Sequence, residues 1–183
     1  MRQDRAVSGR QRKSPTFPDL IRTLVVFAVL IGGFIALLPK QKHDAVKQVD
    51  YGSDLSIFAR AAGYPAIVPT PVPDGWTVTS FRGHSLRDGK TPSTMHMGMV
   101  TAAKKYAALE ETDGDPTIWI AIQTLKAPQS GSVVIDGVEW QRYDRKGVVS
   151  LARTASGFTT VVTGGAALEE LETLIRSLRP AKV

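Results

Sequence analysis

The sequence predicts an α+β protein, in which an N-terminal transmembrane helix precedes an antiparallel β-sheet domain with a short N-terminal helix and an amphipathic C-terminal helix packed on the sheet. Three observations lead to this class. Residues 20–38 form one long apolar run. Residues 76–164 consist of short, partly alternating segments separated by turn dipeptides. Residues 166–180 repeat leucine at helical spacing.

The apolar run has the length and composition of a membrane-spanning helix. No charged residue occurs from Thr23 to Leu38, and about 20 apolar residues suffice to cross a bilayer as a helix. Pro39 ends the run, because proline cannot continue the helical hydrogen bonds. A cleaved signal peptide would need small residues at a cleavage site, and none follows before Lys42. We therefore expect an uncleaved signal anchor.

The flanking charges predict the orientation of this segment. Six Lys and Arg residues precede Thr23, and three lie within residues 39–50. The more basic flank stays in the cytoplasm, so the expected location is the cell membrane, single-pass, with the C-terminal domain extracytoplasmic. The expected organisation is a disordered basic tail (1–19), a transmembrane helix (20–38), a polar stalk (39–50) and an extracytoplasmic α+β domain (51–183).

Composition narrows the possible functions. The chain contains no cysteine, which excludes disulfides, thiol catalysis and zinc–thiolate sites. Residues 51–183 carry 14 basic and 13 acidic side chains. The excess positive charge therefore lies near the predicted membrane segment, where topology and anionic headgroups explain it. We expect the lipid bilayer as a partner, no nucleic acid and no cofactor.

The predicted domain begins with a helix and an extended proline-rich segment. A helix is expected over residues 54–62, with Ser53 or Asp54 as its N-cap, ending at Gly63. Residues 65–73 contain four prolines, which force an extended path along the surface or a sheet edge.

Strands follow, joined by turns such as Asp88-Gly89 and Ser156-Gly157. Methionines 95, 97 and 99 should share one face of their strand, with His96 and Gly98 on the other. The strands are expected at residues 76–84, 95–101, 105–112, 117–125, 132–136, 138–144, 148–154 and 158–164.

The C-terminal segment is the clearest helix outside the apolar run. Leu168, Leu171, Leu174, Ile175 and Leu178 lie on one face at helical spacing. Acidic residues come first and arginines last, which suits the helix dipole, and a proline at 180 ends the segment.

No motif in the sequence carries a known chemistry. It has no H-E-x-x-H, G-x-S-x-G, P-loop or G-x-G-x-x-G pattern. The neighbouring glutamates 110 and 111 point to opposite faces of a strand and cannot form a catalytic pair. An enzyme site is possible only if folding brings together dispersed residues. The candidates are His84 or His96 with Asp113, Asp115 or Glu139.

Several segments together resemble a known family. They are PTPVPDGWTVTS, MHMGMVT followed by YAALEET, DGVEWQRY, SLART and TTVVTGGAALEELETLIRSL. In this order, behind a basic tail and one apolar span, they are similar to the uncharacterised actinobacterial membrane-anchored proteins grouped as domain of unknown function 4245. The resemblance covers nearly the whole chain. It implies a single-pass protein with an extracytoplasmic domain in the bacterial envelope, and it supplies no catalytic residues.

We therefore expect a non-catalytic, membrane-anchored binding or accessory domain of the cell envelope, with no catalytic, cofactor-binding or metal-binding residue. The proposed interaction patch is Pro69, Pro71, Pro73 and Trp76, at the end of the proline-rich segment. Two alternatives remain open. One is the envelope enzyme with dispersed His, Asp and Glu residues. The other is a role for the span itself within a multisubunit membrane complex.

Overall fold

The computed structural model describes residues 17–37, 46–86, 88 and 90–182. They form two compact units, which divide between Asp44 and Ala45. The first unit contains helix α1 (Phe17–Leu37), where the sequence predicts a helix over 20–38. Among the described residues, however, no helix is long and apolar enough to cross a membrane. Residues 1–16 of the predicted tail and 39–45 of the predicted stalk lie outside the described residues. Residues 17–19, which are predicted as the end of the disordered tail, instead form the start of α1.

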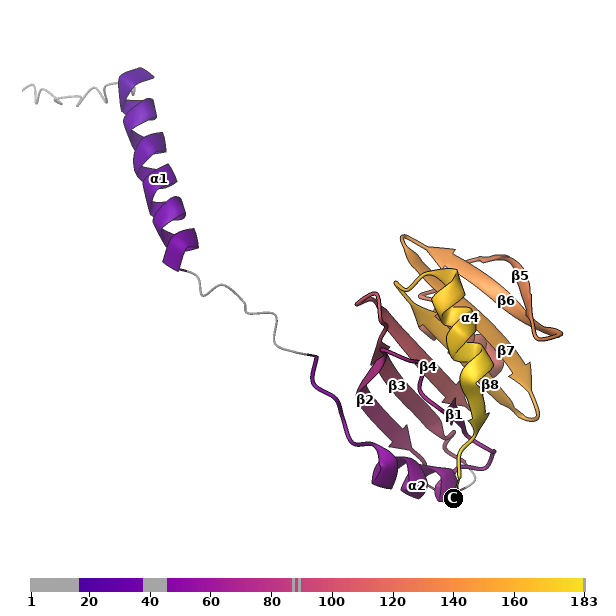
Figure 1. Ribbon diagram of the computed structural model, residues 1–183. Helices are drawn as coiled ribbons and strands as arrows, with labels where there is room; N and C mark the ends of the chain where they lie inside the picture. Colours follow the sequence, from indigo (N-terminus) through magenta and orange to yellow (C-terminus); the bar gives the residue numbers. More distant parts are fainter. Residues whose placement is uncertain (1–16, 38–45, 87, 89, 183) are drawn as a thin grey trace, which may run out of the picture. The chain divides into compact units, whose positions relative to one another are not determined.

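Antiparallel hairpins build the second unit. A seven-stranded sheet has the order β2-β3-β4-β8-β7-β6-β5, so β2 and β5 are its edges (Figure 1). This confirms the predicted α+β class with a large antiparallel sheet. The strands are β2 (Thr77–His84), β3 (Thr94–Val100), β4 (Tyr106–Thr112), β5 (Gln129–Ile135), β6 (Val138–Arg145), β7 (Val148–Ala155) and β8 (Phe158–Gly164).

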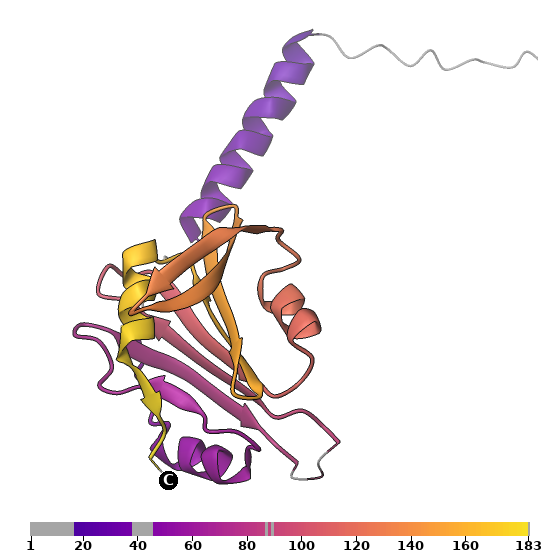
Figure 2. The same cartoon turned by 90° about the vertical axis from the view of Figure 1, so that its right-hand side faces the viewer.

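Helices cover both faces of this sheet. Helix α4 (Leu168–Ser177) packs on β8 and β5, and α3 (Pro116–Gln123) packs on β8, β7 and β4. The two helices lie on opposite sides of the sheet (Figure 2). Helix α2 (Gly52–Ala61) packs against the edge strand β2. A short two-stranded sheet joins β1 (Ile67–Pro69) to β9 (Leu178–Pro180).

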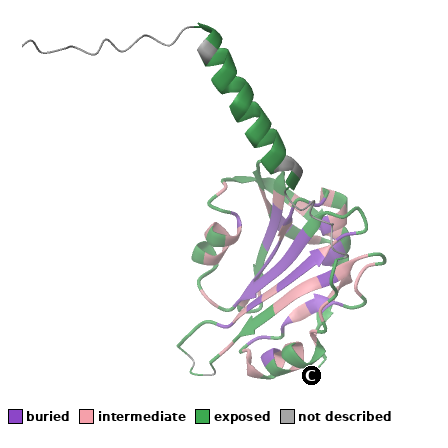
Figure 3. Cartoon of the chain, turned by 90° about the vertical axis from the view of Figure 1, so that its left-hand side faces the viewer, coloured by how far each residue is buried: buried purple, intermediate pink, exposed green. Residues whose placement is uncertain are grey.

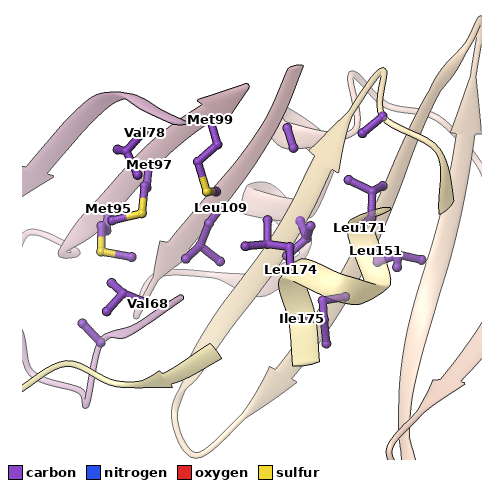
Figure 4. Packing of buried hydrophobic residues seen from close by; sticks show 14 of the residues in the cluster. Val68, Val78, Met95, Met97, Met99, Leu109, Leu151, Leu171, Leu174 and Ile175 are labelled. Carbon is purple, nitrogen blue, oxygen red and sulfur yellow. The ribbon is translucent and has the colours of Figure 1, made fainter. Parts of the chain in front are cut away.

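The core lies between the sheet and α4. Met95, Met97 and Met99 are fully buried on one face of β3, as the alternation predicts. They belong to the same core cluster as Leu109, Leu171 and Leu174 (Figure 4). Fully burying one such side chain contributes about 1.5–3 kcal/mol. The buried residues are concentrated in the central strands of the sheet (Figure 3).

One predicted strand is wrong. Residues 117–125 begin with a helix, α3, and not with a strand. The Asp115 carboxylate accepts a hydrogen bond from the Ile118 amide (3.0 Å), and Pro116 occupies the first turn. An acidic N-cap followed by proline is a strong helix start, which outweighs the strand preference of the isoleucines.

The first and last helices of the second unit, α2 and α4, each differ from the prediction at one boundary. Helix α2 begins at Gly52, earlier than the predicted N-cap at 53 or 54, because the Asp50 carboxylate accepts from the Gly52 amide (3.2 Å). Helix α4 ends at Ser177, so Leu178 is not on its face. Leu178 instead lies opposite Pro69 in the β1–β9 pair. Arg179 precedes a proline, and that position disfavours helical backbone.

Candidate functional site

A chain of three polar side chains crosses the open face of β2, β3 and β4. Ser80 Oγ lies 3.0 Å from His96 Nε2, and His96 Nδ1 lies 2.6 Å from Glu110 Oε1. The exposed fraction of the side chain is 22 % for His96 and 9 % for Glu110. Ser80 is half-buried on the edge strand. We call these three residues the Ser–His–Glu cluster.

The strand register creates this cluster. His96 lies directly opposite Glu110, and Ser80 lies opposite Gly98, two residues further along β3. A register irregularity between Val78 and Ser80 changes the direction of the edge strand, as β-bulges commonly do beside functional side chains. His96 therefore points away from the methionine core, as predicted.

Gly98 provides the space in which the polar atoms converge. A β-carbon at this position would overlap Ser80 Oγ and would lie 3.2 Å from both His96 Nε2 and the Tyr106 hydroxyl oxygen. Burial and the charge of Glu110 raise the pKa of Tyr106, while Arg82 opposes this shift. Tyr106 therefore remains a protonated hydrogen-bond donor at neutral pH beside the Ser–His–Glu cluster.

The neighbouring Glu111 points into the core, on the face opposite to Glu110, and the alternation predicts these opposite faces. It is 0 % exposed, and its two carboxylate oxygens share the Ile67 amide at 3.2 and 3.3 Å. Burial raises the pKa of Glu111 to about 9. The residue is therefore a neutral acid that attaches β1 to the main sheet.

The other predicted enzyme candidates are not part of this cluster. Glu139 and His84 are exposed, and His84 lies at the end of β2, opposite Thr94. Asp113 accepts from the Ser93 amide (2.7 Å), and Asp115 caps α3. Of the predicted set, only His96 meets a carboxylate, and that partner is Glu110.

The predicted interaction patch spans two environments. Pro69 is buried in β1, whereas Pro71 is exposed. Pro73 and Trp76 are half-buried, and the Trp76 amide donates to the Pro73 carbonyl (3.1 Å). Three of the four side chains therefore reach the surface, and their role as a patch stays a prediction.

Helix α3 presents a second candidate surface. The sequence does not predict this surface, because it predicts a strand over these residues. None of its residues is fully buried (Figure 3). Ile118 and Ile122 are 61 % and 57 % exposed, and their i, i+4 spacing places them on one side of the helix. Leu125, which is 64 % exposed, follows the C-cap Thr124 with a positive φ of 53° and lies just beyond the end of α3. We call these three residues the α3 face.

Cationic side chains lie beside the C-terminal end of this face. Lys126 follows Leu125 directly and is exposed. Arg145, from the end of β6, donates a hydrogen bond to the Leu125 carbonyl. The exposed Lys146 follows Arg145 in the chain. The side of α3 that faces the sheet borders a hollow of about 510 Å³, lined among others by Ile120, Thr124 and Tyr143.

Among the described residues, no group of three or more His, Asp or Glu side chains is arranged to hold a metal ion.

The family can be assigned by comparison with known proteins. The model of the family described as "Protein of unknown function (DUF4245)" matches residues 12–178. The chain belongs to the DUF4245 family. The match confirms the family to which the sequence segments are similar.

Other comparisons add little. No curated protein matches the chain. Among solved structures, a chain of the MucA/MucB complex of Pseudomonas aeruginosa is similar, with 17 % sequence identity and a TM-score of 0.36. The match covers 64 % of the DUF4245 chain and 36 % of the other, so the DUF4245 chain spans about a third of that protein's length.

Proposed function

We propose that this DUF4245 protein is a membrane-tethered binding domain of the bacterial cell envelope. Residues 20–38 would tether it, with the N-terminus in the cytoplasm and residues 51–183 outside. The uncharged run from Thr23 to Leu38 and the basic N-terminal flank support this topology. The described large apolar side chains of α1 are exposed and need an apolar environment.

The absence of cysteine from the sequence makes the topology easy to test, because an introduced cysteine is the only thiol. Ser8→Cys and Ser132→Cys place it in the tail and in the exposed edge strand β5. A membrane-impermeant maleimide added to intact cells should label Ser132→Cys alone, and alkaline carbonate should leave the protein in the membrane. Labelling of Ser8→Cys alone, or extraction by carbonate, would contradict the tether and its orientation.

The α3 face is the observation that carries the binding role. Its three side chains are each about 60 % exposed, so their complete burial would contribute roughly 3–5 kcal/mol in total. Association of two free proteins costs about 4–15 kcal/mol in lost freedom. The apolar contacts of the α3 face alone are therefore too few to hold a free protein partner. A membrane also attracts the basic side chains nearby, so the same face can bind vesicles weakly without the tether and more tightly with it.

The charges beside the α3 face indicate which surface that is. Lys126 and Arg145 lie at its C-terminal end, and the exposed Lys146 follows Arg145 in the chain. Each basic residue near an anionic bilayer contributes about 1 kcal/mol. An apolar helix face beside basic side chains fits the interface of a membrane with anionic headgroups. We propose that the α3 face docks on this membrane surface, a role that requires no catalytic residue.

Vesicle flotation tests this docking with residues 46–183, which form a compact unit with its own core. The domain should float with vesicles containing phosphatidylglycerol, and less well with pure phosphatidylcholine or at high salt. Ile122→Asp should weaken binding at least about tenfold. The matched control is Val134→Asp, which changes another exposed apolar residue (67 %) on β5.

Two outcomes would contradict the docking role. One is the absence of flotation with either vesicle. The other is equal loss of binding in Ile122→Asp and Val134→Asp. If Ile122→Asp instead removes a co-purifying protein without changing vesicle binding, the α3 face is a protein interface and the lipid assignment is wrong.

The alternative role as an envelope enzyme is retained for the Ser–His–Glu cluster alone. The remaining predicted residues (His84, Asp113, Asp115 and Glu139) are exposed or engaged elsewhere.

A further inference from the structure

We propose that Ser80 is an activated nucleophile, with His96 as its general base and Glu110 as the residue that positions the histidine, and that this cluster transfers acyl groups from small carboxylic esters to water. This inference goes beyond the docking role and does not depend on it, because the cluster and the α3 face share no residue.

The two hydrogen bonds suit one tautomer of the neutral imidazole, the tautomer that a general base needs. A carboxylate only accepts, so His96 Nδ1 carries a proton and donates it to Glu110 (2.6 Å). The neutral ring then has its lone pair on Nε2, 3.0 Å from Ser80 Oγ. The serine hydroxyl donates to that nitrogen. A nucleophile, a base and a group that orients the base are thus in hydrogen-bond reach of one another, as this chemistry requires.

The carboxylate is the most enclosed of the three groups. Glu110 is buried on the interior strand β4, whereas His96 on β3 and Ser80 on the edge strand β2 are half-buried. A low dielectric around the carboxylate strengthens its interaction with the imidazolium that forms during attack. A serine at the sheet edge remains accessible to a small substrate.

Gly98 and Tyr106 complete the surroundings of the serine. The space that a side chain at 98 would fill is bordered by Ser80 Oγ, His96 Nε2 and the Tyr106 hydroxyl. A hydroxyl donor at this position can hydrogen-bond the oxygen on which negative charge develops. Arg82, on the same face of β2 and opposite His96 in the register, adds a positive charge nearby.

The proton and bond changes balance. Ser80 Oγ attacks the ester carbonyl carbon while its proton passes to His96 Nε2, and the carbonyl oxygen becomes an oxyanion. Collapse of this intermediate breaks the bond to the alkoxy oxygen, which takes the proton from Nε2 and leaves as an alcohol. Water then attacks the acyl-serine, with Nε2 again taking and returning one proton. The products are the carboxylic acid, the alcohol and the original serine.

The first test treats the full-length protein, purified in mild detergent, with a fluorophosphonate that forms a covalent bond with activated serines. Mass spectrometry should locate the phosphonyl group on Ser80. Labelling should disappear in Ser80→Ala and fall at least about a hundredfold in His96→Gln, while Ser132→Ala, which changes an exposed serine on the opposite edge strand, should label like wild type. No phosphonyl group on Ser80 would overturn the proposal.

The second test needs no substrate and keeps the serine position occupied. Ser80→Cys and Ser132→Cys each carry one thiol in a chain without cysteine. A base beside a thiol favours the reactive thiolate, so iodoacetamide should alkylate Ser80→Cys at least about tenfold faster than Ser132→Cys below neutral pH. Adding His96→Gln should abolish the difference. Equal rates for the two single variants, with unchanged melting temperatures, would show that His96 does not activate position 80.

Glu110→Gln separates positioning from structural support. The amide keeps the shape of the carboxylate but can no longer stabilise an imidazolium by charge. We expect the pH dependence of Ser80→Cys alkylation to shift while the melting temperature stays close to that of Ser80→Cys alone. An unchanged pH profile would contradict the assigned role of Glu110.

Discussion

The buried acid Glu111 makes the stability of the domain depend on pH in a defined direction. The Glu111 side chain is completely enclosed and has only the Ile67 amide as a hydrogen-bond donor among the described contacts. Burial raises its pKa from 4.5 to about 9 in the folded state. Between these two values the unfolded chain is ionised at this position and the folded chain is not. The free energy of unfolding must therefore fall as the pH rises.

The size of the effect follows from linkage. Below pH 4.5 both states hold the proton, and Glu111 contributes no pH dependence. Above it, the unfolded state loses its proton first, and each pH unit lowers the free energy of unfolding by about 1.4 kcal/mol. Because of Glu111, the free energy of unfolding at pH 7 is therefore about 3 kcal/mol lower than it is below pH 4.5. The loss ends where the folded state itself ionises, near pH 9.

Replacing Glu111 by glutamine removes this titration and keeps an oxygen acceptor for the Ile67 amide. We expect urea unfolding of residues 46–183, followed across pH 4.5 to 9, to show a steeper decline for wild type than for Glu111→Gln. The stability gap between the two should widen by about 3 kcal/mol up to pH 7. Glu139→Gln, which changes an exposed glutamate on β6, should follow wild type. Parallel pH profiles for wild type and Glu111→Gln would refute the assignment of a neutral, buried Glu111.

Three further substitutions test the packing and the helix start. Gly164→Ala should lower the free energy of unfolding by at least about 1–3 kcal/mol, because the added β-carbon would overlap the Tyr106 carbonyl oxygen. The control is Gly165→Ala, where the nearest atom to the added β-carbon lies at 3.9 Å, and this variant should melt like wild type. Asp115→Ala removes the cap of α3 and should cost about 0.5–2 kcal/mol in urea unfolding. The same variant should weaken vesicle binding, since the α3 face depends on the helix. Unchanged unfolding in Asp115→Ala would contradict the capping role.

Much of the fold could be predicted from local patterns. The alternation around Met97 predicts which face of β3 is buried, and the leucine spacing near the C-terminus predicts α4. The turn dipeptides separate most strands correctly. These patterns succeed because one face of each element is buried and the other is not.

The errors arise where a local contact outweighs composition. A strand is predicted over residues 117–125 because isoleucine and tryptophan favour strands. The Asp115 cap and Pro116 instead start a helix. The same error concealed the α3 face, because helical spacing is needed to place Ile118 and Ile122 on one side.

The Ser–His–Glu cluster could be predicted only in part. Alternation places His96 away from the core and separates Glu110 from Glu111. The partner of His96, however, depends on the register between β3 and β4, and the position of Ser80 depends on the irregularity in β2. Pairing between strands is decided by the whole sheet and leaves no pattern within one strand.

Membrane docking of the α3 face is the central claim, and the depth of a spin label tests it most directly. The full-length protein would be placed in nanodiscs with anionic lipid, with one label at Ile122→Cys or at Val134→Cys. The account predicts that oxygen relaxes the label at 122 more than a water-soluble nickel chelate does, whereas the label at 134 shows the opposite preference. If both labels are relaxed mainly by the nickel chelate, the α3 face lies in water and the proposed docking is wrong.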